Sequence, residues 1–187
     1  VLVRVRACSL NFRDQLIPQG KYFGGTIGED IVPLSDGAGE VVAVGAGVTQ
    51  FSIGDRVAGT FFQNWPDGPP NPFMGPALGA PPAKGMLAEY VALPETGVVR
   101  IAESLTFEEA ATLPCAGVTA WNALMEGAHP TKAGETVLVL GTGGVSLLAL
   151  QIAKAAGATV VATSSSGAKI ARIRGLGADQ TINYRSI

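Results

Sequence analysis

The segment from residue 136 to residue 166 constrains the fold more than any other part of the chain. It opens with an apolar run, residues 137–140, that is short and rich enough in β-branched side chains to predict a fully buried strand of a parallel sheet. Glycines follow at once, and apolar residues with helical spacing then continue as far as Gly157. A second strand is predicted over residues 159–162. This order of strand, glycine turn, helix and strand is typical of a dinucleotide-binding βαβ unit.

The glycine turn matches the pattern G-x-G-x-x-G except that Ser146 occupies the third glycine position. The strand before the turn and the helix after it supply the context that the motif requires. A membrane span is the alternative for the uncharged run 138–153, but this run is too short and is interrupted by glycines. We therefore expect the backbone at the turn and the helix N-terminus to hold the pyrophosphate of a dinucleotide, through Gly141, Gly143, Gly144 and Val145.

The residues after the second predicted strand indicate that the dinucleotide is NADPH. Sites for NAD place a carboxylate roughly 20 residues beyond the first glycine, where it binds the ribose 2′-hydroxyl. This chain has Thr-Ser-Ser-Ser there, at residues 163–166, so no carboxylate repels a 2′-phosphate, and the hydroxyls of Ser164 and Ser165 can donate to it. Lys169 falls in the first turn of the next predicted helix, where the helix dipole disfavours a cation unless an anion is bound beside it. A solvated surface lysine is the alternative.

Composition excludes several other functions. The net charge is -2, which gives no basic surface for nucleic acid and no polybasic tract for a membrane. Charged residues make up only 15% of the chain and hydrophobic ones 47%, as in a well-packed globular protein. Cys8 and Cys115 lie far apart in sequence, which predicts free thiols in a reducing cytoplasm. The only histidine, His129, precedes a proline in a predicted loop and is a poor candidate for a general base.

The chain is predicted to divide near residue 115. Before this point, short apolar runs alternate with glycine turns, which predicts a β-rich domain. Residues 64–85 are so rich in proline and glycine that we expect a long surface loop, which either borders a substrate cleft or is a disordered insertion. At the junction, Thr106 and Glu109 have the spacing of a capping box and predict a helix start.

Both ends of the sequence suggest a fragment of a longer protein. Alternation typical of a strand begins at the first residue, and a third parallel strand is predicted to start at Thr181, close to the last residue. Because a doubly wound sheet needs more strands than this, we expect the fragment by itself to be inactive.

Four separated segments, residues 9–14, 33–41, 107–121 and 141–146, together resemble the medium-chain dehydrogenase/reductase superfamily, and within it the zinc-independent quinone oxidoreductase-like branch. The resemblance implies an α/β protein with a GroES-like substrate domain, residues 1–115 without its N-terminal part, followed by the first half of a Rossmann cofactor domain, residues 116–187. It also implies a cytoplasmic oxidoreductase that transfers hydride to a small carbonyl compound such as a quinone or an enone, and a homodimer when full length.

The resemblance further implies that the chain binds no metal. A catalytic zinc needs three protein ligands, and the family's ligand positions match Asn11, Ser35 and Cys115, of which only the cysteine is a good zinc ligand. The Pro/Gly-rich segment stands where related zinc enzymes carry a second, structural zinc. Without zinc, Asn11 is expected to be the catalytic donor that polarises the substrate carbonyl, unless it only stabilises a turn.

Other site residues follow from the same comparison of motifs. Asp14 is a second catalytic candidate, although it could instead form a structural ion pair with Arg13. Thr119 matches a position beside the nicotinamide, and Lys169 and Tyr184 match residues of NADPH-using quinone oxidoreductases. The sequence thus predicts an NADPH-dependent, zinc-independent reductase. The alternatives are an NADP-dependent alcohol dehydrogenase of the same superfamily, or a protein of another class that binds NADPH without turnover.

Overall fold

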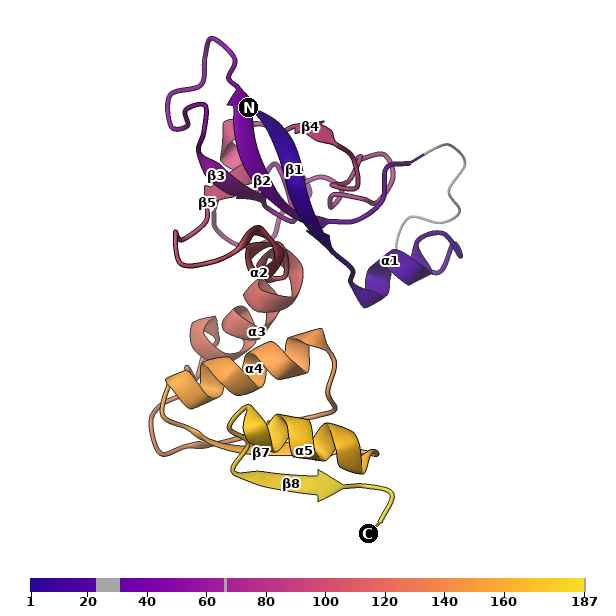
Figure 1. Cartoon of the computed structure of the whole chain (residues 1–187), viewed down its shortest axis with the longest axis vertical. Coiled ribbons are helices and arrows are strands. Elements are labelled where there is room, and N and C mark those ends of the chain that lie inside the picture. Colours follow the sequence, from indigo (N-terminus) through magenta and orange to yellow (C-terminus); the bar gives the residue numbers. More distant parts are fainter. Residues whose placement is uncertain (23–30, 66, 187) are drawn as a thin grey trace. The chain divides into compact units, whose positions relative to one another are not determined.

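The structure is a computed structural model that describes residues 1–22, 31–65 and 67–186 (Figure 1). It divides into two compact units, Val1–Cys115 and Ala116–Ile187. The predicted α/β class is confirmed, because the first unit is built on an antiparallel sheet and the second on a parallel one.

The first unit contains a five-stranded sheet in the order β4-β1-β2-β3-β5, with every neighbouring pair antiparallel. Its strands are β1 (Leu2–Ser9), β2 (Asp36–Ala43), β3 (Arg56–Gly59), β4 (Tyr90–Ala92) and β5 (Val98–Arg100). The helical elements of this part of the chain are α1 (Phe12–Leu16), η1 (Glu95–Gly97), α2 (Phe107–Ala111) and η2 (Leu113–Gly117), the last of which spans the unit boundary. The predicted capping box is present at the start of α2, where Glu109 N–H donates to Thr106 Oγ1 at 3.1 Å.

Close contact between β1 and β2 depends on a glycine. A Cβ atom added at Gly39 would lie 2.2 Å from the carbonyl oxygen of Arg4, so no other residue fits that position without backbone movement. The main core lies on this sheet and is formed by Val3, Val41, Phe51, Val57, Leu78, Met86, Leu93 and Val98. A smaller alanine-rich cluster, which includes Ala38, Ala58 and Ala110, packs α2 against the sheet.

The prediction of a long surface loop at residues 64–85 is partly wrong. The described part of this segment, which omits residue 66, contains no regular strand or helix, and residues 67–73 are exposed as expected. However, Leu78 is only 3% exposed and belongs to the core, and Ala77 and Ala80 are buried beside it. These apolar side chains fold inward because the short strands alone leave core surface to cover.

The second unit contains the predicted βαβ arrangement. Its parallel sheet has the order β6 (Thr136–Val139), β7 (Thr159–Ser164) and β8 (Gln180–Asn183), and its helical elements are α3 (Val118–Trp121), η3 (Asn122–Glu126), α4 (Gly144–Ala155) and α5 (Gly167–Gly175). Gly157 ends α4 with φ +81°, the left-handed conformation predicted for this position. Leu150 and Ala153 of α4 and Ile173 of α5 share one core with Val160 and Ala162 of β7.

The prediction that residues 137–140 form a fully buried strand is wrong. β6 lies at the edge of the sheet, and Leu138 and Leu140 are 58% and 71% exposed, whereas Val139 is buried. Side chains alternate between the two faces of a strand, and both α4 and α5 pack on the face that carries Val139 and Val160. No described element of this unit covers the opposite face of β6.

Candidate functional site

The first group of predicted site residues lies where β1 passes into α1. Asn11 is the N-cap residue of α1, and its backbone N–H donates to Asp14 Oδ2 at 2.7 Å, while the N–H of Asp14 donates to the Asn11 carbonyl at 3.0 Å. These bonds satisfy backbone groups that the short helix leaves unpaired. Asp14 therefore holds the backbone of Asn11, and the structure brings the two predicted catalytic residues together.

Arg13 forms the predicted ion pair with Asp14. The two side chains are buried, with 3.6 Å between Arg13 Nη1 and Asp14 Oδ1. Arg13 Nη1 also donates to the carbonyl of Leu78 at 2.9 Å, and the guanidinium lies 4.7 Å from the ring centroid of Tyr22 and 4.8 Å from that of Phe61. Arg13 thus attaches α1 to the inward-folded part of the Pro/Gly-rich segment.

Asp36, which was not among the predicted site residues, lies at the centre of this group. Its carboxyl is fully buried, with Oδ1 accepting from Ser35 Oγ at 2.8 Å and Oδ2 accepting from the Cys115 backbone N–H at 3.1 Å. Burial raises the pKa of Asp36, while hydrogen bonding from Asn11, Ser35 and Cys115 opposes the rise and the charge of Asp14 adds to it. Local spacing could not predict this convergence, because the partner segments are separated by up to 79 residues.

Neither Cys8 nor Cys115 takes part in a disulfide in the part of the chain that the structure describes, and neither favours its thiolate form. Burial and the charge of Asp36 raise the pKa of Cys8, whose Sγ lies 3.2 Å from the Met86 carbonyl. Burial, with the same carboxylate, raises the pKa of Cys115 to about 11. Within residues 1–22, 31–65 and 67–186, no three His, Cys, Asp or Glu side chains are grouped so that they could hold a metal ion.

The second group of predicted site residues surrounds the glycine turn between β6 and α4. Gly141 has φ +80°, and its N–H donates to Thr163 Oγ1 at 3.0 Å, which ties the turn to the end of β7. A Cβ atom added at Gly141 or Gly143 would meet nothing within 4 Å, and one at Gly144 would meet only Ala116 Cβ, at 3.8 Å. The space above the turn is therefore open, and the backbone at the N-terminus of α4 is accessible to a ligand.

The residues predicted to bind the 2′-phosphate meet at the carboxyl end of β7. Ser164 is buried, its Oγ accepts from Ser166 N–H at 3.3 Å, and its carbonyl accepts from Tyr184 N–H at 3.2 Å. Ser166 is the N-cap of α5, and Lys169 is exposed in the first turn of that helix. Ser164, Lys169 and Tyr184 thus lie at or just beyond the carboxyl ends of β7 and β8, and half-buried Ser165 lies between the strand and α5.

The remaining predicted cofactor residues lie on the helices beside the turn. Val145, in the first turn of α4, is 41% exposed. Thr119 is an exposed residue of α3, a helix that packs against α4. Thr163, which holds the turn through Gly141, was not predicted as a site residue, although its place directly after the second predicted strand could have indicated it.

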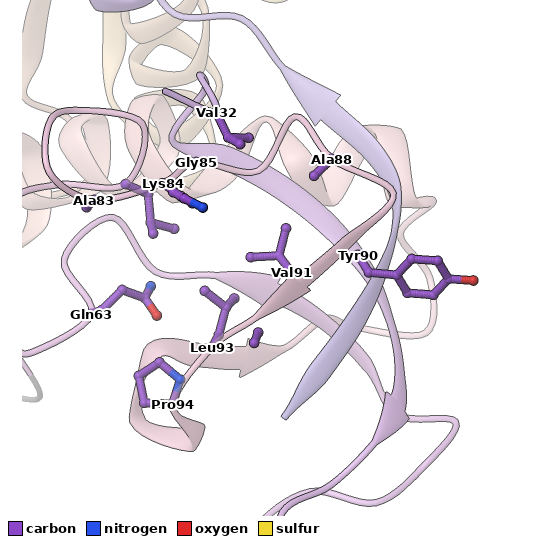
Figure 2. A pocket seen from close by; sticks show the side chains of 12 residues that line it. Val32, Gln63, Ala83, Lys84, Gly85, Ala88, Tyr90, Val91, Leu93 and Pro94 are labelled. Atoms are coloured by element: carbon purple, nitrogen blue, oxygen red, sulfur yellow. The ribbon is translucent and has the colours of Figure 1, made fainter. Parts of the chain in front are cut away.

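A hollow of about 350 Å³ lies beside β4 in the first unit and contains none of the predicted site residues (Figure 2). It is lined mainly by apolar groups, with Lys84 from the Pro/Gly-rich segment and Gln63 as polar neighbours, while the Tyr90 hydroxyl points away (Figure 2). Gln63 Nε2 donates hydrogen bonds to the carbonyls of Thr60 and Gly97, at 2.7 and 3.0 Å. The Pro/Gly-rich segment thus borders a hollow of the first unit, and its role at a substrate cleft stays a prediction.

Comparison with known proteins gives matches over the whole chain. The alcohol dehydrogenase GroES-like domain matches residues 1–103, and the zinc-binding dehydrogenase family matches residues 144–187. A zinc-type alcohol dehydrogenase-like protein of Schizosaccharomyces pombe is 47% identical over 99% of this chain and 54% of its own length. A quinone oxidoreductase structure from Pseudomonas syringae superposes with a TM-score of 0.75 at 36% identity, over 98% of this chain and 50% of that one. The structure of an NAD-dependent alcohol dehydrogenase gives 0.86 at 36% identity, over 99% and 55%.

The fold is that of the alcohol dehydrogenase-like oxidoreductases, with a GroES-like domain followed by part of a Rossmann-type domain. The chain belongs to the medium-chain dehydrogenase/reductase superfamily. It spans about half the length of the relatives that it matches. Along the described residues, none of the helices has both the length and the apolar character that a membrane crossing requires.

Proposed function

We propose that the protein to which this chain belongs is an NADPH-dependent oxidoreductase that transfers hydride to a quinone, an enone or another small carbonyl compound without zinc. The first unit would be its substrate domain and the second its cofactor domain. The cytoplasmic location and the homodimer stay predictions. The observation that carries the proposal is the open glycine turn, because no described residue fills the space above Gly141 and Gly143.

The position of the open turn makes it a candidate ligand site. An open glycine alone does not indicate a ligand, because Gly45 also meets nothing within 4 Å. Gly143, however, is the N-cap of α4 just after β6, and neither packing nor a positive φ requires glycine there. A pyrophosphate bound at the α4 N-terminus would need this free approach to the backbone. The residues present therefore fit a dinucleotide, whose nicotinamide supplies the hydride when bound.

The choice of NADPH over NADH rests on the end of β7. Hydroxyl side chains, not carboxylates, occupy residues 163–166, and Lys169 is exposed in the first turn of α5 with no ion pair among the described residues. A 2′-phosphate beside Ser165 and Lys169 would offset the unfavourable position of a cation at a helix N-terminus. The relatives themselves do not decide the cofactor, since one bears NAD in its name.

At the substrate end we propose Asn11 as the polar group that meets the reacting carbonyl compound, with Asp14 holding the Asn11 backbone in place. The absence of zinc is proposed because the positions that match family zinc ligands are Asn11, Ser35 and Cys115, and burial disfavours ionisation of the only thiol among them. Orientation and hydrogen bonding would then have to support hydride transfer without a metal.

The test is an NADPH-oxidation screen of the intact protein against quinones, enones, aldehydes and ketones, with zinc measured in the same preparation. Lys169→Ala should weaken NADPH binding by about 10-fold or more, since a charge-assisted hydrogen bond is worth roughly 1.5–3 kcal/mol, and should leave NADH binding nearly unchanged. Arg172→Ala, which removes a cation of α5 outside the predicted site, is the matched control. Equal losses for the two cofactors would refute the NADPH assignment, and one zinc per chain would refute the metal-free mechanism.

An alcohol dehydrogenase of the same superfamily is the second candidate, because two of the three relatives described above carry that name. Such an enzyme would oxidise simple alcohols with NADP at rates comparable to carbonyl reduction. A protein that binds NADPH without turnover would give binding in the same screen and no oxidation with any acceptor.

A further inference from the structure

One peptide group of the glycine turn is held by side-chain hydroxyls at both of its ends. The N–H of Gly141 donates to Thr163 Oγ1 at 3.0 Å, and the carbonyl of Leu140 accepts from Ser146 Oγ at 2.8 Å. The carbonyl of one residue and the N–H of the next belong to the same planar peptide group, so both bonds act on a single rigid unit. The two hydroxyls come from different elements, Thr163 from β7 and Ser146 from α4.

Thr163 continues the pairing of β6 with β7 by one further bond. The main-chain register of the two strands ends at Val139 and Ala162. Gly141 lies just beyond this end, where the chain leaves the sheet with φ +80°. A backbone N–H that leaves a sheet needs a new hydrogen-bond partner, and the Thr163 side chain supplies it.

Ser146 occupies the third glycine position of the motif, where the chain departs from G-x-G-x-x-G. It lies in the first turn of α4, and its hydroxyl reaches back to the carbonyl of Leu140, directly after β6. A glycine at this position has no side chain and could not make the bond. The departure from the motif therefore adds a second contact that holds the turn.

The glycines of the turn make such contacts necessary. A glycine backbone is free to adopt many conformations, and a Cβ atom added at Gly141 or Gly143 would meet nothing within 4 Å, so packing does not restrain these residues. A loose turn would have to be ordered when a ligand binds, and that loss of conformational entropy would weaken binding. Two hydrogen bonds on one peptide group remove part of this cost in advance.

We propose that Ser146 and Thr163 are positioning residues that fix the Leu140–Gly141 peptide group, so that the glycine turn has its binding conformation before a dinucleotide arrives. This deepens the proposed function and rests on it, since the turn is proposed there to hold the pyrophosphate. Because NADPH and NADH share the pyrophosphate, the two hydroxyls support the binding of both. Lys169, in contrast, is proposed to act on the 2′-phosphate of NADPH alone.

Dissociation constants of the intact protein for NADPH and NADH test the role in binding. Thr163→Val keeps the shape of the side chain without its oxygen and should weaken both cofactors by about 3- to 10-fold, the range expected for one hydrogen bond. Thr163→Ser keeps the hydroxyl and should stay within about 2-fold of wild type. Thr159→Val is the matched control and should change neither constant, since Thr159 is a half-buried threonine of the same strand whose side chain makes no hydrogen bond among the described residues.

A double-mutant cycle tests whether the two hydroxyls act on one group. Ser146→Ala should weaken both cofactors as Thr163→Val does. The double variant should lose less than the product of the two single losses, because release of either end already frees the peptide group. Hydrogen exchange of the Gly141 amide, followed by NMR with isotope-labelled glycine, measures the contact itself. Exchange should be faster in Thr163→Val and unchanged in Thr163→Ser and Thr159→Val.

Several outcomes would overturn the proposal. Wild-type affinity or unchanged Gly141 exchange in Thr163→Val would refute the positioning role, and losses that multiply in the double variant would refute the joint action. A loss confined to NADPH would place the hydroxyl at the 2′-phosphate and not at the turn. A wild-type protein that binds neither dinucleotide would refute the proposed function, whereas exchange at Gly141 would still decide whether the hydroxyls hold the peptide group.

Discussion

Replacement of Arg13 by methionine should destabilise the first unit strongly, because the guanidinium is buried among groups that all require its charge. The side chain is 7% exposed, contacts the rings of Tyr22 and Phe61, donates to the Leu78 carbonyl and is paired with Asp14. Methionine keeps much of the length and apolar contact of arginine. The loss therefore measures the charge and hydrogen bonding, with little contribution from packing.

The magnitude follows from opposing contributions. Removal of one partner of a buried ion pair costs roughly 3–5 kcal/mol, because the other charge is left uncompensated. The Leu78 carbonyl also loses its donor, which costs about 1–3 kcal/mol more. Part of this is offset, since Arg13 Nε and Nη2 are already buried without hydrogen-bond partners among the described residues and each such group costs about 1–3 kcal/mol in the wild type. Mid-range values of these terms give a net loss of about 2 kcal/mol, of which Asp14→Asn in the same chain should recover roughly 1 kcal/mol by removing the orphaned charge.

Trp65 provides the assay, because its ring contacts Phe62 in the first unit with 5.7 Å between centroids. Trp121→Phe removes the other tryptophan, so fluorescence during denaturant unfolding then reports on the first unit. Arg100→Met is the matched control, since Arg100 also stacks on an aromatic ring and pairs with a carboxylate, but its side chain is 57% exposed. An equal loss for Arg100→Met, or no loss for Arg13→Met, would refute the argument that burial makes the difference.

Three further results are expected. The half-buried thiol of Cys115 has a pKa raised from 9.0 to about 11, so in a Cys8→Ser chain it should react slowly with a disulfide reagent at pH 8.5, and rapid labelling of the native protein would contradict this. Because the raised pKa belongs to the folded state, the contribution of this thiol to the free energy of unfolding should be lost as the pH rises from about 9 to about 11. Gly85→Ala should unfold the first unit or destabilise it by several kcal/mol, because the new Cβ would lie 2.2 Å from the Leu34 carbonyl oxygen. Gly45→Ala, whose new Cβ meets nothing within 4 Å, should be nearly neutral when thermal unfolding of the two variants is compared. Thr106→Ala should cost about 1 kcal/mol in denaturant titration through loss of the α2 cap, and a loss below about 0.3 kcal/mol would show that the capping box contributes little.

The local order of the elements could be predicted from sequence wherever one short-range signal decided it. The strand, glycine turn, helix and strand of residues 136–164 follow from apolar periodicity and from Gly157, and the start of α2 follows from the Thr106 and Glu109 spacing. The pairing of Asn11 with Asp14 is also local, because one helical turn separates them. These features depend on backbone preferences and on neighbours within a few residues.

Tertiary structure alone decided which groups are buried and which distant groups meet. Leu78 enters the core although its surroundings are rich in proline and glycine, and Leu138 is exposed although it belongs to an apolar run. Asp36 receives a hydrogen bond from the Cys115 backbone, 79 residues away, which no local spacing could predict. Burial and long-range hydrogen bonds depend on how separate segments fold over one another, and single-chain periodicity carries no record of those contacts. The sequence by itself thus determined the kind of residue at each end of the proposed site, whereas the packing of the folded chain decided which of those residues are buried and which distant segments surround the Asp36 carboxyl.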